Sequence, residues 1–263
     1  MGQRVKKTGR HDRETGIGGN QNFVVRDEVL VTYRGSRRNV TIPGNLGITA
    51  IRNHAFSCYE GLESIAMPAG VISIGEEAFR GCTNLQSVTI PAGVTAIEHC
   101  AFADCTGLQS ITIPGSVTVI NYTVFSGCTN LSTITVDAEN PHFTAVDGVL
   151  FDKHKSRILC CPVGKEGAEY FIPNNVTAIG DCAFLYCINL QSIIIPNGVT
   201  GIAFGAFCKC TSLRSITMPD SVTVIEKRAF KDCKSLKTVC LSRKTCVDKT
   251  AFEGTLAEFF YTD

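Results

Sequence analysis

The side chains with the widest chemical repertoire in this chain are its fourteen cysteines, among 263 residues. A thiolate is a nucleophile, a metal ligand and a partner in disulfide exchange. The cysteine spacing does not suggest pairs, because six of them share one position of a recurring pattern, four residues after an alanine or valine that precedes a phenylalanine. These six are Cys82, Cys105, Cys128, Cys187, Cys210 and Cys233. Free cysteine packs as a small hydrophobe with a weak S–H donor, so we predict a buried ladder of reduced thiols.

A second group that could do chemistry lies between Asp152 and Cys161. Asp152, His154, Cys160 and Cys161 are all metal-ligating residue types, but their spacing lacks the two matched pairs of a standard zinc finger. The five histidines are scattered and share no repeat position, and the glycines form no phosphate-binding loop. We therefore expect no cofactor, no resident metal and no enzymatic activity. A metal- or thiol-dependent site in the 152–161 insert stays open as the alternative.

The elements that position these side chains follow from a recurring phenylalanine. Ala-Phe or Val-Phe pairs recur in steps of 23 residues, with one long gap in the middle and a final step that is one residue short. The phenylalanines are Phe56, Phe79, Phe102, Phe125, Phe184, Phe207, Phe230 and Phe252. A fixed period of this length is the signature of a solenoid, in which stacked coils bury a face that one coil cannot bury alone.

One repeat, residues 78–100, shows how a coil is built. Around Val88, apolar and hydroxyl residues alternate as in a half-buried strand, and Pro91 ends that strand because proline has no amide to donate. A Pro-Ala-Gly corner follows, and Val94 and Ile97 then form a second short inward-facing segment. The stretch around Ala101 and Phe102 is expected to be a short helical or 3-10 return.

Two units break the period. From Phe125 to Phe184 there are 59 residues, which is one repeat and 36 more, and residues 23–43 look like a matching unit at the other end. Each is expected to be an elongated coil built on a β-hairpin. We predict a disordered basic tail over residues 1–22 and a single solenoid over residues 23–263, with an elongated unit at about 137–182.

The outward side of the strand in each coil is the most interesting candidate surface. It is a nearly uncharged ladder of small hydroxyl residues with one apolar exception, Ile194. The candidate binding face consists of Ser87, Thr89, Ser110, Thr112, Thr133, Thr135, Ser192, Ile194, Ser215 and Thr217. Threonine also suits any pleated surface, so the same pattern fits a purely structural role. Solenoids characteristically bind along such extended faces, and small side chains favour modest affinity.

Charge is unevenly distributed although the net charge is only +1. Residues 226–250 carry eight Lys/Arg against three Asp/Glu, whereas residues 41–225 carry eight against fourteen. The basic end is either a solvated surface or a site for an anionic partner. No run of about 18 apolar residues and no signal-peptide core is present, so we expect no membrane insertion. We also expect no nucleic-acid partner.

The string AFADCTGLQSITIPGSVTVI and its register-matched copies strongly resemble the BspA-like leucine-rich repeat family. The resemblance implies a β-rich α/β solenoid, a right-handed leucine-rich-repeat coil stack with one parallel sheet face and short helical or 3-10 returns. It also implies a non-enzymatic module for protein–protein recognition or adhesion, with a host protein, a matrix protein or a glycan as partner. The family favours the cell surface or secretion, whereas reduced cysteines favour the cytoplasm, so localisation stays open.

Overall fold

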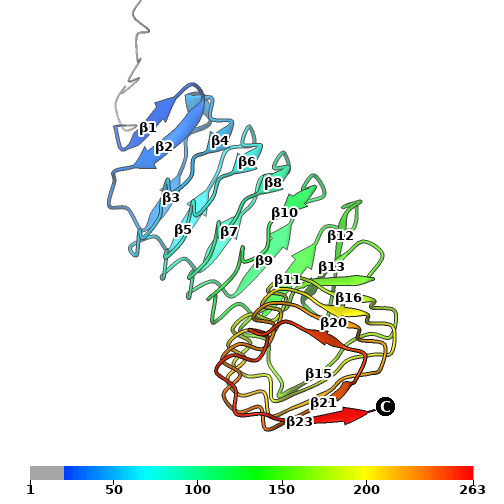
Figure 1. Cartoon of the computed structure of the whole chain (residues 1–263). Helices are drawn as coiled ribbons and strands as arrows, with labels where there is room; N and C mark the ends of the chain where they lie inside the picture. Colours follow the sequence, from blue (N-terminus) through cyan, green and yellow to red (C-terminus); the bar gives the residue numbers. More distant parts are fainter. Residues whose placement is uncertain (1–20, 263) are drawn as a thin grey trace, which may run out of the picture.

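The chain is a stack of β-coils, and the computed structural model describes residues 21–262 of it. Figure 1 shows successive coils laid side by side, each with strands on two faces. The predicted disordered tail lies outside the described residues, except for Gln21 and Asn22, which form a turn. The expectation of a β-solenoid with parallel sheets is confirmed.

The first face, here called the strand face, carries the strand that alternates apolar and hydroxyl residues. Its members are β3 (Asn39–Thr41), β5 (Ser64–Ala66), β7 (Ser87–Thr89), β9 (Ser110–Ile113), β11 (Thr133–Val136), β15 (Glu169–Phe171), β17 (Ser192–Ile194), β19 (Ser215–Thr217), β21 (Thr238–Ser242) and β23 (Glu258–Thr262). They form three parallel sheets, β3-β5-β7, β9-β11 and β15-β17-β19-β21-β23. Ser64 pairs with Ser87 and Thr112 with Thr135, so each register step equals one repeat.

A second parallel ladder runs along the opposite part of each coil. It contains β2 (Val29–Tyr33), β4 (Ala50–Ile51), β6 (Ser73–Ile74), β8 (Ala96–Ile97), β10 (Val119–Ile120), β14 (Arg157–Cys160), β16 (Ala178–Ile179), β18 (Gly201–Ile202), β20 (Val224–Ile225) and β22 (Cys246–Val247). The prediction of one parallel sheet face is therefore incomplete. The short segment around Val94 and Ile97 has only two residues in strand conformation, which is too short for an alternating pattern to be visible in sequence.

Antiparallel strands occur only in the two elongated units of the described chain, as the sequence predicts. β1 (Phe23–Arg26) pairs with β2, and β12 (Phe143–Val146) and β13 (Val149–Asp152) form a hairpin that continues into β14. β14 then rejoins the parallel ladder at β16.

The returns differ from the expected short helices. Among residues 21–262 the only helix is a 3-10 turn, η1 (Gly44–Leu46), and the returns are successive single turns. Seven returns contain a pair of left-handed residues four apart, such as Glu77 and Gly81 with φ of 53° and 70°. A left-handed residue interrupts a right-handed helix, so none can extend. The amide that a helix would use internally donates instead to the next coil, as Phe79 N–H does to the carbonyl of Ala101 at 2.8 Å.

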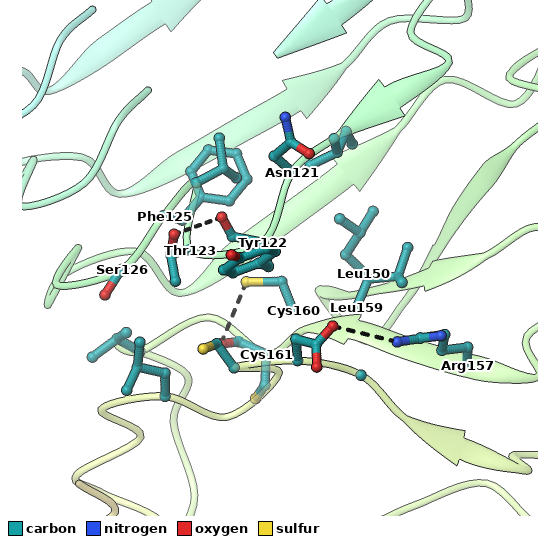
Figure 2. A pocket seen from close by; sticks show the side chains of 17 residues that line it. Asn121, Tyr122, Thr123, Phe125, Ser126, Leu150, Arg157, Leu159, Cys160 and Cys161 are labelled. Carbon is teal, nitrogen blue, oxygen red and sulfur yellow. Dashed lines mark hydrogen bonds and ion pairs between the residues drawn. The ribbon is translucent and has the colours of Figure 1, made fainter. Parts of the chain in front are cut away.

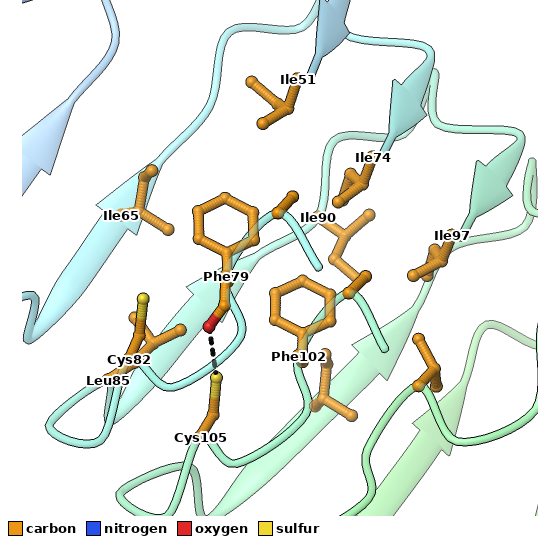
Figure 3. Close-up of a cluster of buried hydrophobic side chains, with 14 of the residues drawn as sticks. Ile51, Ile65, Ile74, Phe79, Cys82, Leu85, Ile90, Ile97, Phe102 and Cys105 are labelled. Atoms are coloured by element: carbon orange, nitrogen blue, oxygen red, sulfur yellow. Dashed lines mark hydrogen bonds between the residues drawn. The ribbon is translucent and has the colours of Figure 1, made fainter. Parts of the chain in front are cut away.

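The core is an aromatic ladder flanked by aliphatic columns (Figure 3). Phe79 and Phe102 stack with ring centroids 5.2 Å apart and planes 4° from parallel. The ladder is interrupted after Phe125 and resumes with Tyr170 and Phe184, whose centroids are 5.7 Å apart. Ridges of Ile, Val and Leu fill the coil interior on both sides of this interruption.

At the internal elongated unit the stack divides. The buried residues form two clusters that meet within β13, where Leu150 belongs to one cluster and Phe151 to the other. The second ladder ends at β10 and starts again at β12, without pairing between β10 and β14. In Figure 1 the coils before this unit are seen from the side and those after it nearly along their axis, so the stacking direction changes here.

Replacing one ring of the aromatic ladder tests how much the stack depends on it. Phe102→Ala is expected to lower the free energy of unfolding by about 3–5 kcal/mol, because it removes a fully buried ring between two others and leaves a cavity. Phe260→Ala is the matched control, since Phe260 is exposed, and should cost about 1 kcal/mol or less. Urea denaturation followed by circular dichroism measures both, and equal losses would contradict the ladder as the main support.

Candidate functional site

The ten predicted face residues all lie in strands of the strand face with their side chains directed outward. Eight are exposed, Ile194 among them at 48%, and Thr133 and Ser192 are half-buried. Thr112 and Thr135 hydrogen-bond through their hydroxyls at 2.8 Å. The structure divides the ten between three sheets, with Ser192, Ile194, Ser215 and Thr217 alone in the C-terminal one.

The C-terminal sheet carries an apolar row that the sequence analysis missed. Phe171 pairs with Ile194, Ile194 with Thr217, and Cys240 with Phe260. The β19–β21 register, in which Ile216 pairs with Val239, places Thr217 beside Cys240, so one line crosses the sheet with these two residues between Ile194 and Phe260. Phe171 is 65% exposed and Phe260 is 52% exposed. The available signal was the string YFIP at 170–173, which aligns with IIIP at 193–196 one repeat later. Exposed large apolar side chains in a row mark an interaction surface more specifically than hydroxyls do.

A basic groove borders this row. Arg214 and Lys237 directly precede β19 and β21, and with Lys234, Leu256 and Glu258 they line an open groove at the start of the strands. The cationic side chains are exposed, so their attraction for an anionic group is screened by salt. The C-terminal sheet therefore offers an apolar line and a basic margin side by side.

The cysteine ladder is buried, as predicted, and its thiols act as donors. The Sγ atoms of Cys82, Cys105 and Cys128 each donate to the carbonyl of a phenylalanine in the preceding coil, at 3.2, 3.1 and 3.0 Å. Cys210 and Cys233 repeat this contact at 3.0 Å. All fourteen cysteines are free. The cysteine ladder therefore links successive coils through hydrogen bonds from thiol to backbone carbonyl.

Burial also removes the reactivity of these thiols. Desolvation raises the pKa of Cys82, Cys128 and Cys233 to about 12, despite the opposing effect of a backbone hydrogen bond. It raises the pKa of Cys105 further. Since the thiolate is the reactive form, these groups are chemically silent at neutral pH.

The residues of the 152–161 insert are not brought together. The Asp152 carboxylate accepts hydrogen bonds from Ser156 Oγ at 2.6 Å and from the amide of Arg157 at 2.7 Å. His154 is exposed, whereas the Cys161 side chain is buried. Within residues 21–262 no group of three or more His, Cys, Asp or Glu side chains is arranged to hold a metal ion. The same residues contain no helix long and apolar enough to cross a membrane.

A slot opens where the internal elongated unit meets its neighbours (Figure 2). It is a cavity of about 200 Å³ between the coil at 120–126, the elongated unit and the coil at 180–185. Tyr122 and Phe125 line it from the first coil, and Leu150, Leu159 and Cys160 line it from the elongated unit. Desolvation raises the pKa of the Cys160 thiol far above its usual range, so this group is protonated in the slot.

Polar groups lie at the rim of the slot. Arg157 and Asp181 form a long ion pair at 3.8 Å, with both side chains more than a third exposed. Asn121 is already engaged, because its Nδ2 donates to the carboxylate of Glu98 at 2.6 Å. The interior of the slot is mainly apolar, and its entrance is polar.

Parallel coils with a leucine column, an aromatic ladder and turn-like returns define a leucine-rich-repeat β-solenoid. The sequence matches the BspA type leucine rich repeat region in six copies, over residues 36–155 and 167–262, and the chain belongs to this family. The segment between the matched regions, 156–166, is the part of the elongated unit that contains Cys160 and Cys161. No curated protein sequence matches the chain.

Solved structures extend this likeness at the level of fold. A leucine-rich cell surface protein from Faecalibacterium prausnitzii is 22% identical with a TM-score of 0.62, over 92% of this chain and 93% of that one. The pneumococcal vaccine antigen PcpA is 19% identical with a TM-score of 0.70, over 92% of this chain and 79% of that one. A leucine-rich repeat protein from Eubacterium ventriosum is 23% identical with a TM-score of 0.60, over 87% and 88%.

Thiol titration tests the burial of the ladder. In the folded protein at pH 8 we expect three fast-reacting thiols, Cys58, Cys240 and Cys246, because these are the exposed ones. All fourteen should react after denaturation without a reducing agent. Fewer than fourteen reactive thiols in the denatured protein would indicate disulfides. Rapid labelling of Cys105 in the folded state, mapped by mass spectrometry, would contradict the buried ladder.

The raised thiol pKa values also predict how stability depends on pH. The unfolded chain loses thiol protons near pH 9, whereas the folded chain keeps those of Cys82, Cys128 and Cys233 until about pH 12. The contribution of these thiols is therefore complete below pH 9 and is lost as the pH rises toward 12. Each thiol should lower the free energy of unfolding by about 1.4 kcal/mol per pH unit in that window. Urea titrations of wild type and Cys128→Ala measure this, and the variant should show a shallower slope.

Proposed function

We propose that this protein is a non-enzymatic recognition module that binds another protein through the strand face. The observation that carries the proposal is the apolar row of Phe171, Ile194 and Phe260 on a rigid, hydrogen-bonded sheet. Exposed aromatic side chains supply most of the binding energy at protein interfaces, whereas serine and threonine supply little. In this proposal the serine and threonine residues of β7, β9 and β11 extend the contact area, and the apolar row of the C-terminal sheet supplies most of the binding energy.

We also propose that the two stacks work as one solenoid. Backbone hydrogen bonds across the elongated unit support this, from Ile134 N–H to the carbonyl of Gly148 at 3.0 Å and from Gly164 N–H to that of Leu131 at 2.8 Å. A partner that contacts both sheets would thus meet a surface of fixed geometry.

The preferred partner is a protein of the cell surroundings, such as a host or matrix protein, with a glycan as the second choice. The cell-surface description of the structurally similar Faecalibacterium prausnitzii protein supports this direction, together with membership of the family. The non-enzymatic character is supported by membership of a leucine-rich repeat family and by the burial of the ladder thiols, which raises their pKa.

Binding to an array of purified matrix proteins, serum proteins and glycans tests this function. Phe171→Lys with Ile194→Lys should weaken binding to a captured partner at least tenfold, because two apolar contacts are replaced by hydrated charges. Thr112→Lys with Thr135→Lys should weaken it further if the contact extends over the N-terminal stack.

Charge reversal at the basic end is the matched control. Lys231→Glu with Lys234→Glu should leave the affinity within about twofold, and affinity should depend only weakly on salt. Normal binding by both lysine double variants, with loss of binding on charge reversal, would overturn the strand-face proposal in favour of an electrostatic site.

A further inference from the structure

The slot at the elongated unit exists because that unit lacks two residues. The position of the stacked phenylalanines in each coil is here called the ring column. In a regular coil it follows the inward isoleucine by five positions, as Phe102 follows Ile97, but Cys161 follows Ile158 by only three. Cys161 occupies the ring column, since its amide donates to the carbonyl of Ala183, as the Phe184 amide does to that of Ala206. The shorter return leaves an opening beside the following coil.

The N-terminal elongated unit has the same shortened return, with three positions from Leu30 to Tyr33. There, Val31, Arg52, Asn53 and His54 line an open notch. The internal slot differs because the coil at 120–126 covers it from the other side and makes it a cavity. The missing residues leave a gap about one strand spacing thick, roughly 4.8 Å, which suits a flat group.

Two backbone amides of residues that line this gap have no hydrogen-bond acceptor among the described residues. In the other coils the amides at the ring column donate to the next coil, for example Phe102 N–H to the carbonyl of Val124 at 3.0 Å and Phe207 N–H to that of Ala229 at 2.7 Å. Among the described residues no acceptor is found for the equivalent amide of Phe125. The Thr123 amide also has none, like its counterparts at Cys100 and Arg228 in regular coils, and both Thr123 and Phe125 line the slot. An unsatisfied buried amide is costly, so the site favours an occupant that accepts hydrogen bonds.

We propose that the slot binds a small aromatic group that carries a hydrogen-bond acceptor, about the size of one phenol ring. The ring would lie between the apolar walls of Phe125 and Leu159, and its oxygen would accept from the amides of Thr123 and Phe125. An apolar cavity of about 150 Å³ is enough to hold benzene, so a cavity of about 200 Å³ accommodates a phenol. This site is separate from the strand face and does not depend on the proposed recognition function.

Titration with p-cresol, monitored by NMR of the intact chain, tests the site. We expect saturable binding with a dissociation constant on the order of 0.1–1 mM, as for a buried ligand of this size. The amide signals of Thr123 and Phe125 should shift, and their hydrogen exchange should slow, because both gain an acceptor. Absence of saturable binding, or exchange that is already slow and stays unchanged, would show that ordered water alone satisfies these amides and would overturn the proposal.

Filling variants localise the site. Cys160→Phe places a ring inside the slot and should weaken p-cresol binding at least tenfold. Thr32→Phe is the matched control, because Thr32 occupies the equivalent position in the open N-terminal notch and should leave binding unchanged. Equal effects of the two variants would contradict the assignment. If Cys160→Phe does not fold, the amide shifts of the wild type at Thr123 and Phe125 decide the question alone.

Two further probes define the chemistry. N-acetyl-tyrosinamide should bind as p-cresol does if the natural occupant is a tyrosine side chain of a bound polypeptide, and should not bind if the slot takes only free small molecules. Cyclohexylmethanol has a similar size without a flat ring. Binding of this alcohol as tight as that of p-cresol would overturn the aromatic preference.

Discussion

The structure depends on one constraint: a coil of 23 residues cannot bury its own apolar face or pair its own backbone. Every coil therefore obtains both from its neighbours, through parallel strand pairs such as Ile97 with Ile120 and through amides such as that of Phe79. Thiols add a further set of coil-to-coil hydrogen bonds, which makes cysteine a structural residue here. Burial that makes the ladder cysteines useful in packing also suppresses their reactivity, whereas Cys58, Cys240 and Cys246 are exposed.

Regular parts of the fold were predictable because each column repeats the same physical requirement. The Phe, Leu, Val and Ile columns, the buried cysteines and the hairpins of the elongated units are all found where the sequence places them. The turn-like returns were not predicted, since left-handed residues such as Glu77 and Cys100 have no special side-chain signature. Sequence periodicity likewise shows which residues face inward but not that two-residue segments pair into a second ladder.

The candidate sites lie where the repeat is imperfect, and this limits what sequence alone reveals. Phe171 and Phe260 were overlooked because they replace hydroxyl residues in units at the edge of the pattern. Predicting the slot requires the number of residues between the inward isoleucine and the ring position, here Ile158 to Cys161. It also requires knowing that β10 and β14 do not pair. The first was available in sequence and the second was not. Irregular coils are thus the places where a repeat protein acquires distinct surfaces.

The missing hydrogen bond at Phe125 has a consequence for tension along the rod. A pulling force applied to the two ends is transmitted from coil to coil, and each regular step shares the load among both ladders and the return. At the elongated unit the β10–β14 pairing and this return contact are absent, so fewer bonds carry the same load. Under tension the rod would yield first at this joint, and the two stacks would separate before either one unravels.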